Sequence, residues 1–159
     1  MTKLQPNTTI ADLATPCLLL DRARLERNIA RVQARARSLG VDLRPHMKTA
    51  KSIDVAKRAT QGFSGGITVS TLAEAAYFLK HGFRDITYAI GIAPAKLDTI
   101  ATMQKDGAIV RILTDNVEAA RAIAARAKAL GASFRVMIEI DTGHGRAGVS
   151  PTGPELLAV

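Results

Sequence analysis

The chain has 159 residues, 47% of them apolar, which suits one folded unit but falls short of the roughly 200 to 250 residues of a complete eight-fold barrel. No apolar run reaches the roughly 18 residues of a membrane span, and the N-terminus lacks the pattern of a secretory signal. The single cysteine, Cys17, excludes an internal disulfide, and metal-binding spacings such as CxxC are absent. We therefore expect a cytoplasmic protein with no membrane association and no metal ligands in this chain.

The formal charge of +8 raises nucleic acid as a partner, because clustered lysines and arginines neutralise phosphates. Six arginines lie along one expected helix, at positions 22, 24, 27, 31, 35 and 37. Only two tyrosines, four phenylalanines and no tryptophan are present to stack on bases. We therefore expect a solvated basic helix face and no nucleic-acid partner. The same positive field would favour an anionic cofactor or substrate.

The first expected elements are a short strand and a long helix. Residues 17–20 form a continuous apolar run after Pro16, which is typical of a strand buried on both faces. Between Asp21 and Gly40, which suit the start and the end of a helix, apolar residues recur at spacings of three and four. The apolar face predicted in this way consists of Leu25, Ile29, Val32, Ala36 and Leu39.

Helices and strands alternate along the rest of the chain. Thr71 with Glu74 forms a capping-box pattern for a helix that ends at residue 82, and Asp115 with Glu118 starts a similar helix that ends at residue 131. The strand candidates are residues 43–48, 66–70, 85–90, 109–114 and 134–141. Their starts are about 19 to 25 residues apart, the spacing of successive βα units in a parallel sheet.

Two α/β architectures fit this alternation: an open doubly wound domain, or the first part of a (β/α)8 TIM barrel. The periodicity alone does not separate them. Residues 155–159 resemble the start of a helix, and a domain rarely stops inside the helix that covers its last strand. We therefore predict the N-terminal part of a barrel, truncated after about five strands.

Functional side chains gather at the carboxyl ends of parallel strands in both architectures. The segment RPHMKTAK at residues 44–51 places Lys48 at such an end, between Arg44 and Lys51. Partial burial near other cations would lower the pKa of its amine and make it a nucleophile for an aldehyde. A lysine that extends into solvent fits the same pattern, and His46 by itself fits a packed histidine as well as a catalytic one.

Three glycines after the last strand, Gly143, Gly145 and Gly148, match the spacing of a dinucleotide-binding fingerprint. A true fingerprint opens a helix, whereas Pro151 and the end of the chain soon follow here, so we expect no such site. Arg146, between these glycines, is a permanently charged donor suited to a phenolate, carboxylate or phosphate.

Hydroxyl groups at other strand ends could orient a ligand, and these belong to Thr68, Ser70 and Tyr88. Ser70 is explained equally well as a helix cap, and Tyr88 as a core residue with its hydroxyl at the rim. Neither the elbow motif of a Ser-His-Asp triad nor the P-loop pattern occurs in the sequence.

Together these motifs resemble the D-serine dehydratase and D-threonine aldolase group of fold-type III pyridoxal phosphate (PLP) enzymes, which have an alanine racemase-type barrel. The matching stretches are TP at 15–16, LRPHMKT at 43–49, ITVSTLAEA at 67–75, DITYA at 85–89 and EIDTGHGRAGV at 139–149. They follow the family's order along nearly the whole chain, and RPHMKT is the most specific of them. The stretch at 67–74 is more similar to the D-serine dehydratase side of the group.

The resemblance implies that Lys48 carries the PLP and that Arg146 contacts the phenolic oxygen of its ring. The further cofactor-binding residues that we expect on this basis are His46, Thr68, Ser70 and Tyr88. The family usually has a histidine two residues after the lysine, and Ala50 stands there in this sequence, so the contribution of that histidine is missing.

The resemblance also divides the chain: residues 1–21 would pack with a second, β-rich domain, and residues 22–159 would form the partial barrel. The remaining barrel strands, the phosphate-binding loops and the ligands of a zinc or manganese ion would then lie beyond Val159. A homodimer is implied for the full-length protein.

We therefore expect the full-length protein to be a PLP-dependent lyase that acts on a small D-β-hydroxy amino acid, of the dehydratase or the aldolase type. This chain alone should be inactive, because much of the implied site lies outside it. An amino-acid racemase of the same fold and a non-catalytic PLP-binding protein are the alternatives.

Overall fold

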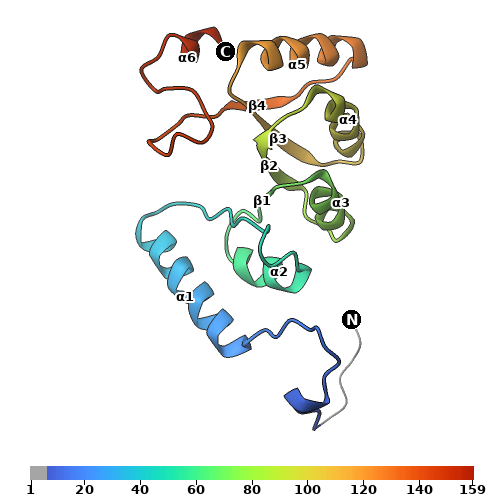
Figure 1. Ribbon diagram of the computed structural model, residues 1–159, viewed down its shortest axis with the longest axis vertical. Coiled ribbons are helices and arrows are strands. Elements are labelled where there is room, and N and C mark those ends of the chain that lie inside the picture. Colours follow the sequence, from blue (N-terminus) through green and yellow to red (C-terminus); the bar gives the residue numbers. More distant parts are fainter. Residues whose placement is uncertain (1–6) are drawn as a thin grey trace.

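The computed structural model describes residues 7–159 as a parallel sheet with helices packed against it (Figure 1). The strands are β1 (Ile67–Val69), β2 (Asp85–Gly91), β3 (Ile109–Thr114) and β4 (Arg135–Ile138). The helices are α1 (Arg22–Ser38), α2 (Ile53–Thr60), α3 (Leu72–Lys80), α4 (Leu97–Lys105), α5 (Val117–Leu130) and α6 (Glu155–Ala158), with the 3-10 turns η1 (Ile10–Asp12) and η2 (Pro94–Lys96).

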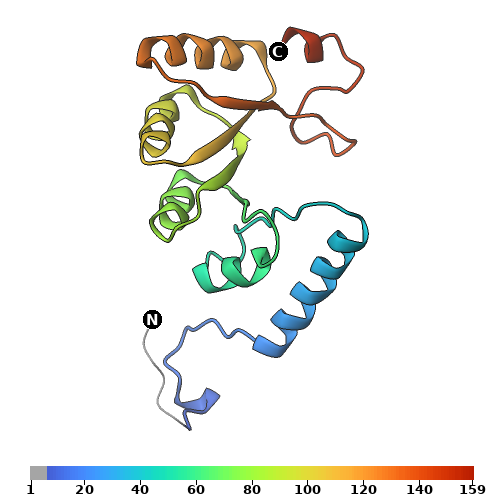
Figure 2. The ribbon, with the colours of Figure 1, turned by 180° about the vertical axis from the view of Figure 1, so that it is seen from behind.

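Strand order separates the two architectures that the sequence left open. The strands are neighbours in chain order, β1-β2-β3-β4, and each pair is parallel. Right-handed crossovers between successive neighbours place every connecting helix on the same face of the sheet. Figure 1 and Figure 2 show α3, α4 and α5 on that one face, whereas a doubly wound domain covers both faces. The arrangement is that of a partial barrel, and the predicted fold class is confirmed.

The hydrophobic core lies between the sheet and these helices. Ile67, Ile86 and Val110 lie in register across three strands and are at most 1% exposed. The next layer of this face, two residues further along, consists of Val69, Tyr88 and Ile112, again at most 1% exposed. Because side chains alternate along a strand, the residues between these layers face the opposite side of the sheet.

The predicted strand at residues 43–48 is present only as a single bridge. His46 pairs with Thr68 of β1, the Met47 amide donates to the Thr68 carbonyl at 2.8 Å, and the Thr68 amide donates to the Pro45 carbonyl at 2.9 Å. Pro45 has no N–H to extend the ladder, so regular pairing stops there. The segment still lies beside β1 at the position of a fifth strand.

The N-terminal part is far more exposed than the sequence suggested. Residues 17–20 form no strand in the described chain, and Leu18, Leu19 and Leu20 are 102%, 61% and 66% exposed. A strand requires a neighbour for its backbone hydrogen bonds, and no described segment supplies one to these residues.

Helix α1 forms as predicted, and the Asp21 side chain accepts from the Arg24 amide at 2.9 Å. Its predicted apolar face is mostly uncovered, because Val32 and Leu39 are about half exposed and Ala36 alone among the five predicted residues is buried. The buried Gln33 attaches α1 to the end of α2, since its amide donates to the carbonyls of Arg58, Ala59 and Gln61.

One expected helix start differs from the structure, and two helices were not expected. The N-cap of α5 is Asn116, whose side chain accepts from the Ala119 amide at 2.8 Å, and Asp115 instead accepts from the Gly148 amide at 3.2 Å. Helices α2 and α4 were not identified from the sequence, because neither has a capping-box pattern. Across residues 7–159, every helix is too short or too polar to cross a membrane.

Candidate active site

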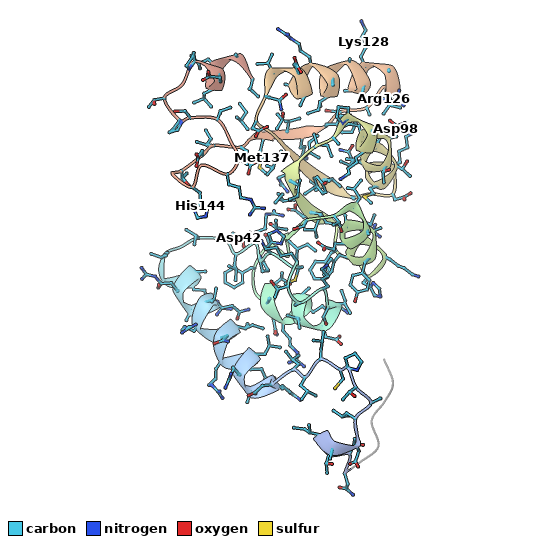
Figure 3. All side chains as sticks on the ribbon, in the orientation of Figure 1. Asp42, Asp98, Arg126, Lys128, Met137 and His144 are labelled. Carbon is cyan, nitrogen blue, oxygen red and sulfur yellow. The ribbon has the colours of Figure 1, made fainter. Side chains whose placement is uncertain are left out.

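Four of the predicted site residues meet at one cavity of about 620 Å³ at the carboxyl ends of the strands. They are His46, Lys48, Ser70 and Arg146, and they come from the segment before α2, the end of β1 and the loop after β4. Figure 3 shows His144, another lining residue, on that loop and on the side of the sheet away from α3 and α4. Glu139 and Asp141 also line the cavity.

Lys48 projects from a tight turn that is anchored on both sides. Met47 before it is 4% exposed and belongs to the hydrophobic core, and its carbonyl accepts from the Lys51 amide at 2.9 Å. The Lys48 amide donates to His46 Nδ1 at 3.2 Å, while the Lys48 side chain is exposed. The turn therefore fixes the backbone of Lys48 and leaves its amine accessible from the cavity.

The cations expected to crowd Lys48 are occupied elsewhere. Arg44 donates to the carboxylate of Asp85 at 2.9 and 2.8 Å. Lys51 forms an ion pair with Glu74 at 3.2 Å. Each of these positive charges is thus paired with a carboxylate. Neither is the unpaired cation beside Lys48 that the sequence suggested.

His46 and Ser70 form a polar pair beside Lys48. The pKa of His46 is lowered, first by partial burial and then by the charge of Lys48, and the carboxylate of Glu74 opposes both effects. A neutral ring that accepts a hydrogen bond at Nδ1 carries its proton at Nε2, and Ser70 Oγ lies 3.4 Å from Nε2. His46 is therefore oriented as a donor toward Ser70.

The loop that carries Arg146 is organised by one carboxylate. Asp141 accepts from the amides of Gly143, His144 and Gly145 at 2.8 to 3.2 Å, and these hydrogen bonds lower its pKa. The loop does not open a helix, since α6 begins only at residue 155. It folds around Asp141 and leaves the Arg146 side chain exposed at the cavity.

A close backbone approach holds the end of this loop. A Cβ on Gly148 would lie 2.6 Å from the Asp141 amide nitrogen, and the φ of Gly148 is +95°. Val149 then returns to the strand end, because its amide donates to the Glu139 carbonyl and its carbonyl accepts from the Asp141 amide, both at 2.9 Å. Only glycine permits both the conformation and the contact at position 148.

Two predicted site residues do not line this cavity. Tyr88 is 1% exposed on the helix-facing side of β2, and its hydroxyl accepts from Lys96 Nζ at 2.8 Å. Thr68 lies in the middle of β1, in register with Thr87, on the opposite face from the core. An alternation count along β1 and β2, starting from their most apolar residues, would have assigned Tyr88 to the core.

Sequence reasoning missed the roles of Asp141 and Glu74. Asp141 was seen only as part of the resemblance, although an aspartate directly ahead of glycines often accepts from the next backbone amides. Glu74 was assigned to a capping box, yet its carboxylate accepts from the Ser70 amide at 2.8 Å and pairs with Lys51. The described residues hold no group of three or more histidine, cysteine, aspartate or glutamate side chains that could bind a metal.

Comparisons with known proteins give a consistent result. The profile of the family described as "Alanine racemase, N-terminal domain" matches residues 20–158. D-threo-3-hydroxyaspartate dehydratase from Delftia sp. (strain HT23) is 44% identical over 152 residues, 95% of this chain and 40% of that protein. D-serine dehydratase from Dictyostelium discoideum is 36% identical over 154 residues, 91% of this chain and 39% of that protein.

Solved structures extend the comparison. The crystal structure of D-threonine aldolase from Filomicrobium marinum is 29% identical and superposes with a TM-score of 0.81, covering 93% of this chain and 40% of that chain. The chain thus spans about 40% of the length of the relatives that it matches. The resemblance predicted from the sequence is confirmed.

Proposed function

Because this chain belongs to the alanine racemase N-terminal domain family, we propose that the whole protein is a PLP-dependent lyase that acts on a small D-β-hydroxy amino acid. The observation that carries the proposal is the position of Lys48, which extends from a fixed turn at a cavity also lined by Arg146. Relatives named as a dehydratase of D-serine, a dehydratase of D-threo-3-hydroxyaspartate and an aldolase of D-threonine support a lyase.

The donor set at the cavity fits PLP. An exposed amine suits the aldehyde, a guanidinium suits the phenolic oxygen, and a hydroxyl and an imidazole suit the remaining polar atoms of an anionic ring. Lys48, Arg146, His46 and Ser70 would therefore hold the cofactor. Thr68 and Tyr88 remain in the proposal only as residues that support the strands beneath the site, since neither lines the cavity.

PLP, when bound, supplies an electron sink for the bonds at the substrate α-carbon. The protein supplies position and proton transfer. Lys48 Nζ would hold the cofactor aldehyde, and the same amine would be the group that can hold or move a proton at that carbon. Arg146 keeps its positive charge at every working pH, and His46 Nε2 offers a donor fixed by Ser70.

The proposal extends to parts that lie outside this chain. Residues 1–21, of which 1–6 lie outside the described structure, would pair with a β-rich domain, and this would cover the exposed Leu18 to Leu20 run. Ligands for a zinc or manganese ion would come from that β-rich domain, and the ion would assist loss or deprotonation of the substrate β-hydroxyl. A cytoplasmic homodimer without nucleic-acid partners completes the proposal.

The first experiment is borohydride reduction after incubation with PLP, followed by peptide mass mapping. Reduction fixes the cofactor to whichever lysine has reacted with it. We expect one modified peptide, containing Lys48, and its loss in K48A. K128A is a matched control, because Lys128 lies on α5 and points away from the sheet (Figure 3). Modification spread over many surface lysines of the folded full natural chain would refute the cofactor site.

The second experiment separates the reactions in the full natural chain. D-serine is tested for release of pyruvate, D-threonine for release of glycine, and alanine for racemisation. We expect one of the first two activities, and K48A should lack it. Racemisation without either lyase reaction would favour the racemase alternative, and covalent attachment of PLP without any activity would favour a non-catalytic PLP-binding protein.

A further inference from the structure

Glu74 is a nearly buried carboxylate that joins two parts of the site. It lies in the first turn of α3 and its side chain is 8% exposed. One oxygen accepts from the Ser70 amide at 2.8 Å, and the other pairs with Lys51 Nζ at 3.2 Å. Burial acts to raise the pKa of Glu74, but the Ser70 amide, the hydrogen bond and charge of Lys51, and the Thr71 backbone together outweigh it and lower the pKa. The carboxylate is therefore ionised at neutral pH.

The first partner, Lys51, closes the turn that carries Lys48. Its φ is +45°, in the left-handed region that residues other than glycine rarely adopt. Its amide donates to the Met47 carbonyl at 2.9 Å, and its side chain reaches back to α3. The ion pair thus holds a strained turn against a helix that is anchored in the core.

The second partner, Ser70, leads to the other side of the same turn. Its hydroxyl lies 3.4 Å from His46 Nε2, and His46 Nδ1 accepts from the Lys48 amide at 3.2 Å. A continuous set of contacts therefore runs from Lys51 through Glu74, Ser70 and His46 to the backbone of Lys48. Glu74 is the one member of this set that contacts both Lys51 and Ser70.

From this arrangement we infer that Glu74 is a positioning residue, which through Lys51 on one side and Ser70 on the other holds the turn that presents the Lys48 amine to the cavity. The effect of Glu74 on PLP attachment at Lys48 rests on the proposed function, whereas the contacts of Glu74 with Lys51 and Ser70 do not. A plain helix cap would satisfy the N-terminus of α3 without contacting Lys51. The two roles therefore differ in what happens when Lys51 alone is changed.

The test compares E74Q, E74A and K51M with wild type in the full natural chain. The glutamine oxygen can still accept from the Ser70 amide, whereas E74Q loses the charge that pairs with Lys51. E118Q is the matched control, because Glu118 lies in the first turn of α5 with an exposed side chain. The readouts are borohydride trapping of PLP on Lys48 at a subsaturating concentration, and hydrogen–deuterium exchange of residues 46–51 without cofactor.

We expect E74A and K51M to reduce trapping on Lys48 by about fivefold and to speed exchange of the turn, with E74Q intermediate. The E74A/K51M double variant should be little worse than either single one, because both remove the same contact. K51R should restore trapping, and E118Q should match wild type. Circular dichroism shows whether each variant keeps its helices.

If E74A fails to fold, K51M alone tests whether the ion pair between Lys51 and Glu74 holds the turn. The Lys51 side chain is 61% exposed, so its loss leaves the core intact. Wild-type trapping and wild-type exchange in K51M would overturn the inference. If wild type itself attaches no PLP at Lys48, the proposed function fails, and the exchange of residues 46–51 alone then decides whether Glu74 positions the turn.

Discussion

The two ends of the strands carry positive charges in opposite arrangements. At the amino ends, Asp85 accepts from Arg44 at 2.9 and 2.8 Å and also from Arg111, and all three side chains are between one quarter and one third exposed. At the carboxyl ends, Lys48 and Arg146 are exposed and form no ion pair within residues 7–159.

The difference indicates which charges stabilise the fold and which are free to bind a ligand. Paired charges at the amino ends already have the partners that stabilise them, and Gly66 leaves room for Arg44, since a Cβ there would lie 2.4 Å from the guanidinium carbon. Unpaired donors at a cavity are available to an anion. Barrel enzymes divide stability and chemistry between the same two ends.

Removal of the central carboxylate should have the largest effect on stability. D85A leaves Arg44 and Arg111 without a carboxylate partner, and we expect a loss of about 2 kcal/mol, below the value for a fully buried pair because water partly screens these groups. Urea unfolding at neutral pH measures it. The control is D98A, which removes the exposed pair between Asp98 on α4 and Arg126 on α5 (Figure 3) and should destabilise the protein much less than D85A, because water screens an exposed pair. Equal losses in both variants would remove the distinction.

A change in the Arg146 loop should be nearly as costly but should act on the site. In G148A the Cβ meets the Asp141 backbone at 2.6 Å, and we expect about 1 to 3 kcal/mol of destabilisation together with weaker PLP binding. G82A is a close control, because Gly82 has the same φ of +95° but no atom within 4 Å of its Cβ position. The difference between the two variants isolates the contact. Identical behaviour would show that the loop can relax.

Removal of an unpaired cation should affect binding and leave stability unchanged. For R146A we expect about tenfold weaker PLP binding in an absorbance titration, with an unfolding midpoint equal to that of wild type. R146K keeps the charge but loses the planar pair of donors, so its affinity for PLP should lie between those of wild type and R146A. R121A, on the exposed face of α5, should change neither quantity. A large loss of stability in R146A would place Arg146 with the structural charges.

The smallest effects concern pH, and they should occur in separate windows. The pKa of Asp85 is lowered, first by its hydrogen bond with Arg44, so its contribution to stability is present above its unfolded value near 3.8 and is lost as the pH falls through its folded value. The pKa of His46 is lowered from 6.5, first by burial, so the folded state binds a proton less readily than the unfolded state. The free energy of unfolding is therefore unaffected by His46 above pH 6.5 and decreases as the pH falls below that value.

Stability measured from pH 8 to pH 3 in wild type, D85N and H46N checks both assignments. D85N should show a smaller decline in acid than wild type, because Glu74 and Asp141, whose pKa values are also lowered, still titrate there. H46N should lose the shallower decline that begins near neutrality. An acid decline as large in D85N as in wild type, or a decline near neutrality that persists in H46N, would contradict the assignment of that decline to Asp85 or His46.

Periodicity and turn chemistry were enough to predict much of the fold. The spacing of apolar residues gave α1 and α5 within one or two residues, and the spacing of strand starts gave the parallel sheet. The RPHMKT block and the glycine-rich loop led to Lys48 and Arg146, which line the same cavity. These signals are local, so a linear pattern carries them.

What the sequence by itself determined is therefore the alternation of strands and helices, the family and the segments at the strand ends. The tertiary structure alone decided that the helices cover one face, that Tyr88 points into the core, and that Glu74 connects Lys51 with Ser70. Each of these depends on strand order, on side-chain direction or on contacts across some 20 residues, and the packing of distant segments sets all three.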